Sequence, residues 1–181
     1  FSKHKIKTIL HLATYYTKHH KYQEINNLIN TNILFPLKLL ELGNKNGLMF
    51  FINTGTFFEY DLKNKFIDEN APKKPINLYA STKIAFEEIL KSYSKEITPV
   101  TLKLFSPYGP KDNEEKIVPM IIKKALLKQE ILLTNGIQKL DFIYINDIIT
   151  AYFNLLNNYE KLKNSYHSFN IGFGQAVSIR E

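Results

Sequence analysis

Short continuous apolar runs alternate along this chain with longer segments in which apolar residues recur every three or four positions. Continuous runs are typical of strands covered on both faces, whereas the three-and-four spacing is typical of amphipathic helices. The expected strands are 7–13, 48–54, 99–105, 141–145 and 169–171. The expected helices are 22–42, 78–94, 115–128 and 147–158. Because strands and helices alternate, the pattern predicts an α/β fold with a doubly wound parallel sheet.

A few residues refine the limits of these elements. Pro36 lies inside the first expected helix and should interrupt or kink it, because proline lacks the amide donor that a helix interior needs. Asn77 precedes the second helix and is expected to be its N-cap. The segment 43–47 is rich in Asn and Gly and predicts a turn, and 61–76 predicts a loop.

Composition narrows the class of protein. A chain of 181 residues with 44% hydrophobic content can form one sizeable core. It has no apolar run of about 18 residues, so we expect no membrane partner. The absence of cysteine fits a reducing compartment and leads us to expect a cytoplasmic location. The net charge of +7 comes from scattered lysines and one arginine, so we expect no nucleic-acid partner.

The first candidate for chemistry is the pair Tyr79 and Lys83. Residues four apart lie on one face of a helix, one turn from each other. A nearby ammonium favours the phenolate and should bring the phenol pKa towards the working range of an acid/base. Tyr159 and Lys163 repeat this spacing, so the surroundings must decide between the two pairs.

Hydroxyl groups occur where the second expected strand ends, at Thr54 and Thr56. The carboxyl end of a parallel strand is where α/β proteins bind ligands, and the helix that carries Tyr79 can lie beside it. A threonine hydroxyl, a phenol and an ammonium would then converge on one oxygen. The alternative is that both threonines form turns and that Tyr79 is a surface residue.

Seven segments, taken in order, resemble the extended short-chain dehydrogenases/reductases, specifically the NAD-dependent epimerase/dehydratase group that acts on nucleotide sugars. Segment 79–83 resembles the active-site motif of that group, and 54–56 with Tyr60 resembles its serine/threonine segment. The remaining segments that carry the resemblance are 9–13, 31–33, 104–110, 138–147 and 169–172. The resemblance implies a Rossmann-like fold with NAD or NADP as cofactor and a nucleotide-diphosphate sugar as substrate.

The same resemblance implies roles for single residues. Tyr79 would be the general acid/base on a sugar oxygen, and Lys83 would lower its pKa and hold the nicotinamide ribose. Thr56 would hydrogen-bond the reacting oxygen. Besides Tyr79 and Lys83, the residues expected to line the cofactor are Leu12, Ala13, Thr14, Thr31 and Phe105. The residues expected to contact the substrate are Thr56, Phe57 and Ser106.

The chain also departs from the family pattern. It contains no glycine-rich phosphate loop and no initiator Met, so we expect a fragment, incomplete at both ends. We expect 1–110 to be the later part of the cofactor-binding domain. Residues 111–181 would form a partial substrate lobe with returning strands. The resemblance is compatible with a homodimer of the full-length protein.

Three residues differ from those that relatives carry at the same positions. Phe57 and Phe58 stand where sugar dehydratases of the group carry an Asp-Glu pair, which favours ketone reduction or epimerisation over dehydration. Leu140 stands where many relatives carry an arginine near the diphosphate.

The histidines show no metal-ligand spacing, so we expect no metal site. The alternative function is a truncated, inactive remnant or an interaction module on the same fold.

Overall fold

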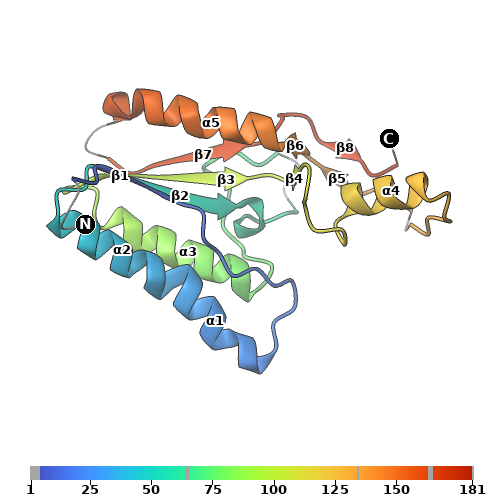
Figure 1. Cartoon of the computed structure of the whole chain (residues 1–181), viewed down its shortest axis with the longest axis horizontal. Coiled ribbons are helices and arrows are strands. Elements are labelled where there is room, and N and C mark those ends of the chain that lie inside the picture. Colours follow the sequence, from blue (N-terminus) through green and yellow to red (C-terminus); the bar gives the residue numbers. More distant parts are fainter. Residues whose placement is uncertain (1–4, 64–65, 134, 163–164, 181) are drawn as a thin grey trace. The chain divides into compact units, whose positions relative to one another are not determined.

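The computed structural model describes residues 5–63, 66–133, 135–162 and 165–180. Its main sheet contains β1 (Thr8–His11), β2 (Phe50–Thr56), β3 (Thr98–Leu104) and β7 (His167–Ile171), in that order (Figure 1). β1 pairs with β2 in parallel, from Thr8 beside Phe50 to His11 beside Asn53. The sheet is parallel and Rossmann-like, which confirms the fold class predicted from the alternation of strands and helices.

The core lies between the main sheet and the helices α1 (Ile25–Ile29), α2 (Phe35–Lys45) and α3 (Leu78–Lys91), which follow one face (Figure 1). Its central cluster is wholly apolar, and burial of such side chains is the main force that holds a sheet and its helices together. The buried members are Leu40, Leu48, Phe51, Phe86, Leu90 and Ile97.

The opposite face of the sheet is also covered. Successive side chains on a strand point to opposite faces, so Phe50 faces away from the cluster that contains Phe51. Its ring stacks on Tyr159, with 5.0 Å between the centroids. Tyr159 begins the short 3-10 helix Tyr159–Leu162, labelled η4. This contact explains why β2 is apolar at consecutive positions.

The first expected helix is divided. A 3-10 turn, η1 (Tyr22–Glu24), leads into α1, and a π-helical turn, η2 (Asn30–Leu34), separates α1 from α2. Pro36 lies in the first turn of α2, directly after the π-helical turn, and it cannot donate a backbone hydrogen bond to that turn. The predicted interruption near Pro36 is confirmed, and it takes the form of a π-helical turn.

The turn predicted at 43–47 begins too early. α2 continues to Lys45, and Gly43 is helical and buried. A Cβ on Gly43 would come within 2.9 Å of Leu48 and 3.2 Å of Ile9, so the lack of a side chain lets the helix pack closely. Tertiary packing therefore outweighs the poor helix propensity of glycine here.

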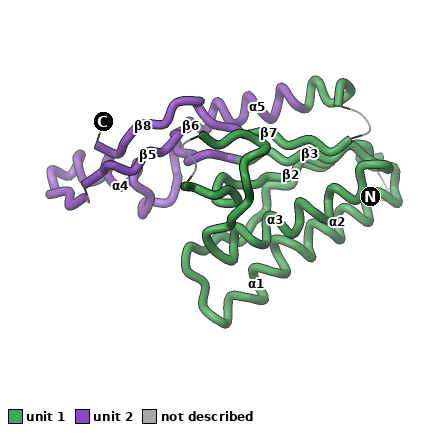
Figure 2. Tube along the Cα trace, turned by 180° about the vertical axis from the view of Figure 1, so that it is seen from behind, with its two compact units in different colours: residues 1–103, 156–170 green, residues 104–155, 171–181 purple. Residues whose placement is uncertain are grey.

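The chain divides into two compact units (Figure 2). The first comprises 1–103 and 156–170, and the second comprises 104–155 and 171–181. We describe each unit by itself. The domain boundary predicted after residue 110 stays a prediction.

The second unit contains one helix, α4 (Ile117–Leu126), most of α5 (Ile145–Asn158), and two small sheets. β4 (Pro107–Tyr108) pairs in parallel with β6 (Ile143–Tyr144). β5 (Lys139–Leu140) pairs antiparallel with β8 (Val177–Ser178). Within the described ranges, none of the helices combines the length and apolar character needed to cross a membrane.

The strand predicted at 141–145 is shorter in the structure, where β6 covers only Ile143–Tyr144 and α5 begins at Ile145. The Asp141 carboxylate accepts hydrogen bonds from the backbone N–H groups of Phe173 (2.7 Å) and Gly174 (2.9 Å). A Cβ on Gly172 would lie 2.6 Å from this carboxylate, so the glycine gives it room. Asp141 thus fixes a turn where the apolar pattern predicted the start of a strand.

Candidate functional site

The predicted catalytic residues come from two packed elements of the first unit. Thr56 is the last residue of β2, and Tyr79 and Lys83 lie one turn apart on α3, which packs against β2. All three are buried, with 8% of Thr56, 8% of Tyr79 and 3% of Lys83 exposed. The alternative that Tyr79 is a surface residue is therefore wrong.

The start of α3 is fixed by Asn77. Its side-chain oxygen accepts a hydrogen bond from the backbone N–H of Ala80 at 2.9 Å, as expected of an N-cap. Tyr79 follows two residues later, so the cap sets the position of the phenol along the helix axis. The prediction of Asn77 as the N-cap is confirmed.

The ammonium of Lys83 lies beside the Tyr79 ring, with Nζ 5.8 Å from the ring centroid. Burial lowers the pKa of Lys83 to about 8, although the charge of Glu59 opposes this. In the part of the chain that the structure describes, Lys83 Nζ makes no hydrogen bond or ion pair. A buried ammonium needs acceptors, and the hydroxyl groups of a cofactor ribose could supply them.

The pKa of Tyr79 differs from the expectation. Burial raises it to about 12, a hydrogen bond with Thr14 lowers it in part, and the charge of Glu59 raises it further. Tyr16 packs edge-on against the Tyr79 ring, with 5.0 Å between centroids. The expected lowering by Lys83 is not found, and loss of hydration is the largest cause of the raised pKa.

Thr56 does form a turn, as the alternative interpretation held. Its Oγ1 accepts a hydrogen bond from Phe58 N–H at 3.3 Å, and its own N–H donates to Glu59 Oε1 at 2.8 Å. This reciprocal pattern is a capping box that starts the 3-10 turn η3 (Phe57–Glu59). A hydroxyl that accepts one hydrogen bond can still donate its own proton, so the turn is compatible with a role on a reacting oxygen.

Thr54 has a different role. Its hydroxyl donates to the backbone oxygen of His11 at 3.0 Å, across from β2 to β1. The side chain thus stabilises the pairing of the two strands at their carboxyl ends.

Four of the residues predicted to line the cofactor occupy two segments of the first unit. Leu12, Ala13 and Thr14 are exposed and follow the carboxyl end of β1 directly. Thr31 is half-buried in the π-helical turn η2. The carboxyl ends of parallel strands are the usual place for a dinucleotide, so these exposed positions fit the group.

Asn32 joins these segments to α3, and it was not among the predicted site residues. Its Oδ1 accepts from Thr14 Oγ1 (3.1 Å) and from Tyr15 N–H (2.8 Å). Its Nδ2 donates to Tyr15 O and to Thr82 Oγ1, both at 3.0 Å. The amide therefore uses four hydrogen bonds to hold the loop after β1 against the helix that carries Tyr79. The resemblance of segment 31–33 to the family is the signal that could have identified it.

The remaining predicted residues divide between the units. Phe57 and Phe58, in the first unit, are half-buried, and their ring centroids lie 4.3 Å apart. Phe105 and Ser106 belong to the second unit, where Phe105 N–H donates to Ile171 O at 2.9 Å. Ser106 has a φ of 31°, a strained conformation of the kind that clusters at functional sites.

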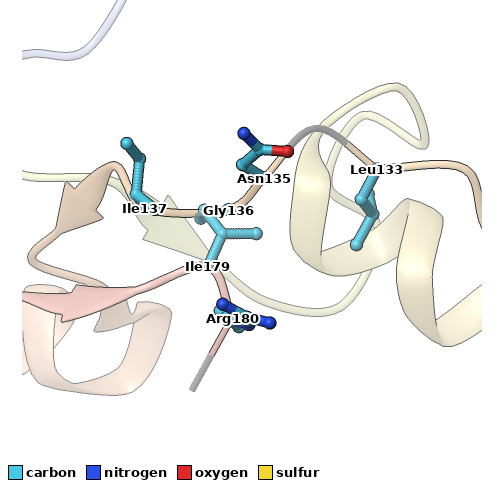
Figure 3. Close-up of a pocket in the computed structure, with 6 residues that line it drawn as sticks. All are labelled: Leu133, Asn135, Gly136, Ile137, Ile179 and Arg180. Carbon is cyan, nitrogen blue, oxygen red and sulfur yellow. The ribbon is translucent and has the colours of Figure 1, made fainter.

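The second unit also contains an open pocket of about 500 Å³ that was not predicted (Figure 3). Its lining residues are Leu133, Asn135, Gly136, Ile137, Ile179 and Arg180. None of the predicted site residues is among them. Among the described residues, no group of three or more histidine, aspartate or glutamate side chains is placed to hold a metal ion.

Comparison with known proteins finds one matching family and several similar enzymes. A family model described as the NAD dependent epimerase/dehydratase family matches residues 1–172. CDP-abequose synthase of Salmonella typhimurium is 35% identical over 181 aligned residues, which cover 96% of this chain and 55% of that protein. The dTDP-4-dehydro-6-deoxyglucose reductase of Escherichia coli is 27% identical, over 99% of this chain and 58% of that protein.

Solved structures give the same result. UDP-glucuronic acid 4-epimerase from Bacillus cereus, solved in complex with UDP-glucuronic acid and NAD, superposes with a TM-score of 0.85. It is 26% identical, and the match covers 97% of this chain and 56% of that chain. The chain thus spans a little more than half the length of the relatives it matches.

Proposed function

Because the chain belongs to the NAD-dependent epimerase/dehydratase family, we propose that it is part of a nucleotide-sugar oxidoreductase that reduces a keto sugar. The observation that carries this proposal is the buried pair Tyr79 and Lys83, one helical turn apart and next to the strand end that holds Thr56. The family uses NAD, and NAD or NADP would supply the hydride.

Each of the predicted site residues has a defined role in this proposal. Tyr79 would donate its phenolic proton to the ketone oxygen of the sugar, whose carbonyl carbon would take the hydride supplied by the bound cofactor. Thr56 donates a hydrogen bond to the same oxygen and orients it. Lys83 would donate hydrogen bonds to the cofactor ribose. Its Nζ is buried and carries three donors, for which the described residues supply no acceptor. Thr14, Thr31 and the backbone at 12–13 hold the cofactor beside them.

The protonated phenol of Tyr79 fits the reduction step, in which it acts as the proton donor. With burial raising the pKa of Tyr79 to about 12, the phenol is protonated at neutral pH and ready to act as an acid. Epimerisation of a hydroxyl must begin with its oxidation, and that step requires the phenolate as base. Phe57 and Phe58 cannot exchange protons, which further supports a simple reduction without dehydration.

The remaining parts of the proposal concern partners. We propose a nucleoside-diphosphate sugar as substrate, contacted in the first unit by Thr56 and Phe57, and a cytoplasmic location. A contact of the substrate with Ser106, in the second unit, stays a prediction. A homodimer of the full-length protein and the absence of a nucleic-acid partner stay predictions.

The proposal is tested in a version of the protein extended to the length of its relatives. Tyr79→Phe should lower kcat for keto-sugar reduction by roughly 100-fold or more, because it removes the proton donor but keeps the ring. Tyr22→Phe is the matched control, since Tyr22 is 84% exposed, and it should keep full activity. Unchanged turnover in Tyr79→Phe, with a native circular dichroism spectrum, would refute the assignment.

A second candidate function is an inactive remnant or an interaction module on the same fold. Calorimetric titration with NAD(H) and NADP(H) separates the two candidates. Binding by the extended version supports the oxidoreductase, whereas binding by neither version supports the second candidate.

A further inference from the structure

Three charged side chains are fully enclosed in the first unit, outside the predicted site. Glu59, Glu87 and Lys103 are each no more than 2% exposed. The ammonium of Lys103 lies 2.5 Å from Glu59 Oε2 and 2.6 Å from Glu87 Oε2. Buried charges are costly unless they are paired, so this arrangement calls for an explanation.

One end of the cluster holds a predicted catalytic residue. Glu59 Oε1 accepts the backbone N–H of Thr56 at 2.8 Å, while its Oε2 pairs with Lys103. Gly55 makes room for this carboxylate, because a Cβ there would lie 2.7 Å from Glu59 Oε1. The backbone at the end of β2 is therefore shaped around Glu59.

The other end of the cluster is on α3. Glu87 follows Lys83 by four residues and Tyr79 by eight, so the three side chains lie on one face of the helix. Lys103 comes from β3, so the two ion pairs connect the end of β2 to α3 through β3. This connection sets the position of Thr56 relative to Tyr79 and Lys83.

Glu59 also acts on the predicted site through its charge. The charged and titratable groups that it faces are Lys103 on β3, Tyr60 beside it in the chain, and Tyr79, Lys83 and Glu87 on α3. Burial raises the pKa of Glu59 to about 7 despite the opposing charge of Lys103. Burial would also raise the pKa of Glu87, but Lys103 and Lys73 hold it well below its ordinary value.

We propose that Glu59 is a positioning residue, which fixes the Thr56 backbone through a hydrogen bond and, through Lys103 and Glu87, ties it to the helix that carries Tyr79 and Lys83. The consequence for catalysis rests on the proposed function, but the effects on Thr56 and Lys83 do not. Both effects can therefore be measured on this chain without turnover.

The first test measures the Lys83 titration by NMR of its Cε. In Glu59→Gln, the midpoint should fall by about one pH unit, because the carboxylate that stabilises the ammonium is gone. Glu88→Gln is the matched control, since Glu88 is on the same helix but 56% exposed and paired with Lys91. The control should leave the Lys83 midpoint unchanged.

The second test follows the Thr56 amide by hydrogen exchange. Glu59→Gln keeps an oxygen that can accept the Thr56 N–H, whereas Glu59→Ala removes it. Exchange at Thr56 should become about 10-fold faster in Glu59→Ala than in Glu59→Gln, because the amide loses its acceptor. Equal exchange in the two folded variants would refute the hydrogen-bonding role.

A third measurement needs no substitution and covers the case in which the variants do not fold. In the parent chain, the Thr56 amide should exchange about 10-fold more slowly than the Phe58 amide, because its acceptor is the buried Glu59 carboxylate at 2.8 Å rather than a hydroxyl at 3.3 Å. Equal exchange at these two amides, or an unchanged Lys83 midpoint in folded Glu59→Gln, would overturn the proposal. Neither outcome would affect the Tyr79→Phe test, so the two failures are distinguishable.

Discussion

His11 ends β1 inside a group of aromatic side chains. Its ring centroid lies about 6 Å from those of Phe35, Phe51 and Phe86, and only 3% of the residue is exposed. Burial lowers the pKa of His11 to about 4, the charge of Lys83 lowers it further, and the nearby side chain of Asn53 offsets a part. The imidazole is therefore neutral at pH 7.

The lowered pKa predicts a loss of stability in mild acid. Between pH 6.5 and pH 4 the unfolded chain binds a proton at His11 and the folded chain does not, so stability falls as the pH falls. The contribution of His11 to the free energy of unfolding should drop by about 2 kcal/mol between pH 7 and pH 5. Urea unfolding of the parent and of His11→Phe at both pH values measures it.

The comparison with His11→Phe is needed because the titration of Glu59 changes the stability with pH in the opposite direction. Its raised pKa makes the folded chain bind the proton first, so its contribution grows as the pH falls from 7 towards 4.5. His20→Phe, at an exposed position, should keep the pH dependence of the parent. If His11→Phe also kept it, His11 would not be the group responsible.

Single functional residues could be predicted from the sequence where their spacing along the chain is short and regular. Tyr79 and Lys83 could be predicted because four residues make one helical turn. Glu59, Lys103 and Glu87 could not, because they are 44 and 16 residues apart and meet only in the folded chain. The high pKa of Tyr79 could not be predicted either, because burial depends on the same long-range packing.

Among the elements, α3 has the clearest start signal. Asn77→Ala should lower the free energy of unfolding by about 1 kcal/mol, because the Ala80 N–H loses its side-chain acceptor. Asn77→Asp should retain most of the stability, since aspartate is also a good N-cap. Chemical denaturation with an unchanged slope is the measurement, and equal midpoints for Asn77→Ala and the parent would contradict the capping role.

Asp141 organises the segment between β5 and β6 and is a second test at this scale. Asp141→Ala should speed hydrogen exchange at the Phe173 and Gly174 amides by about 10-fold, because both lose a charged acceptor. Asp147→Ala, at an exposed position in the first turn of α5, is the control. Slow exchange in Asp141→Ala would show that other contacts hold these amides.

Element types were easier to predict than element limits. Apolar periodicity located the helices that contain Leu40 and Phe86, because their buried faces repeat every three or four residues. The π-helical turn at Asn30–Leu34 leaves no mark in that periodicity. The turn at Asp141 was missed because it depends on backbone amides about 32 residues away in the chain.

The two units differ in how much apolar surface they bury. The central core cluster lies wholly in the first unit, whereas no residue of α4 in the second unit is buried. Ile122 and Leu126 of α4 are 55% and 78% exposed. Local stability follows the density of buried contacts, so it should not be uniform along the chain.

Hydrogen exchange across the molecule should show this difference. Backbone amides in the middle of α4 should exchange on the order of 100-fold faster than those in the middle of α3, because less packing must be broken to expose them. Mass spectrometry of peptides that cover the two helices provides the measurement, with β2 as the slowest reference. Equal protection in α3 and α4 would contradict it.

For the molecule as a whole, the order of motifs along the chain predicted the family and the Rossmann-like sheet, and both are confirmed. The division at 103 and at 156 was not visible in the sequence, because no composition shift marks either position. A unit assembled from two separate stretches depends on contacts that a linear pattern does not contain.

The π-helical turn at Asn30–Leu34 has a consequence for how chain length can vary in evolution. A π-helical turn holds one residue more than the regular helix needs. Deleting that residue would restore a continuous α-helix, but it would rotate the preceding turn by about 100° about the axis. Asn32 would then lose Tyr15 or Thr82, which it now joins. Insertions and deletions among homologous chains should therefore avoid this turn and collect in the exposed segment around Lys18 and His19.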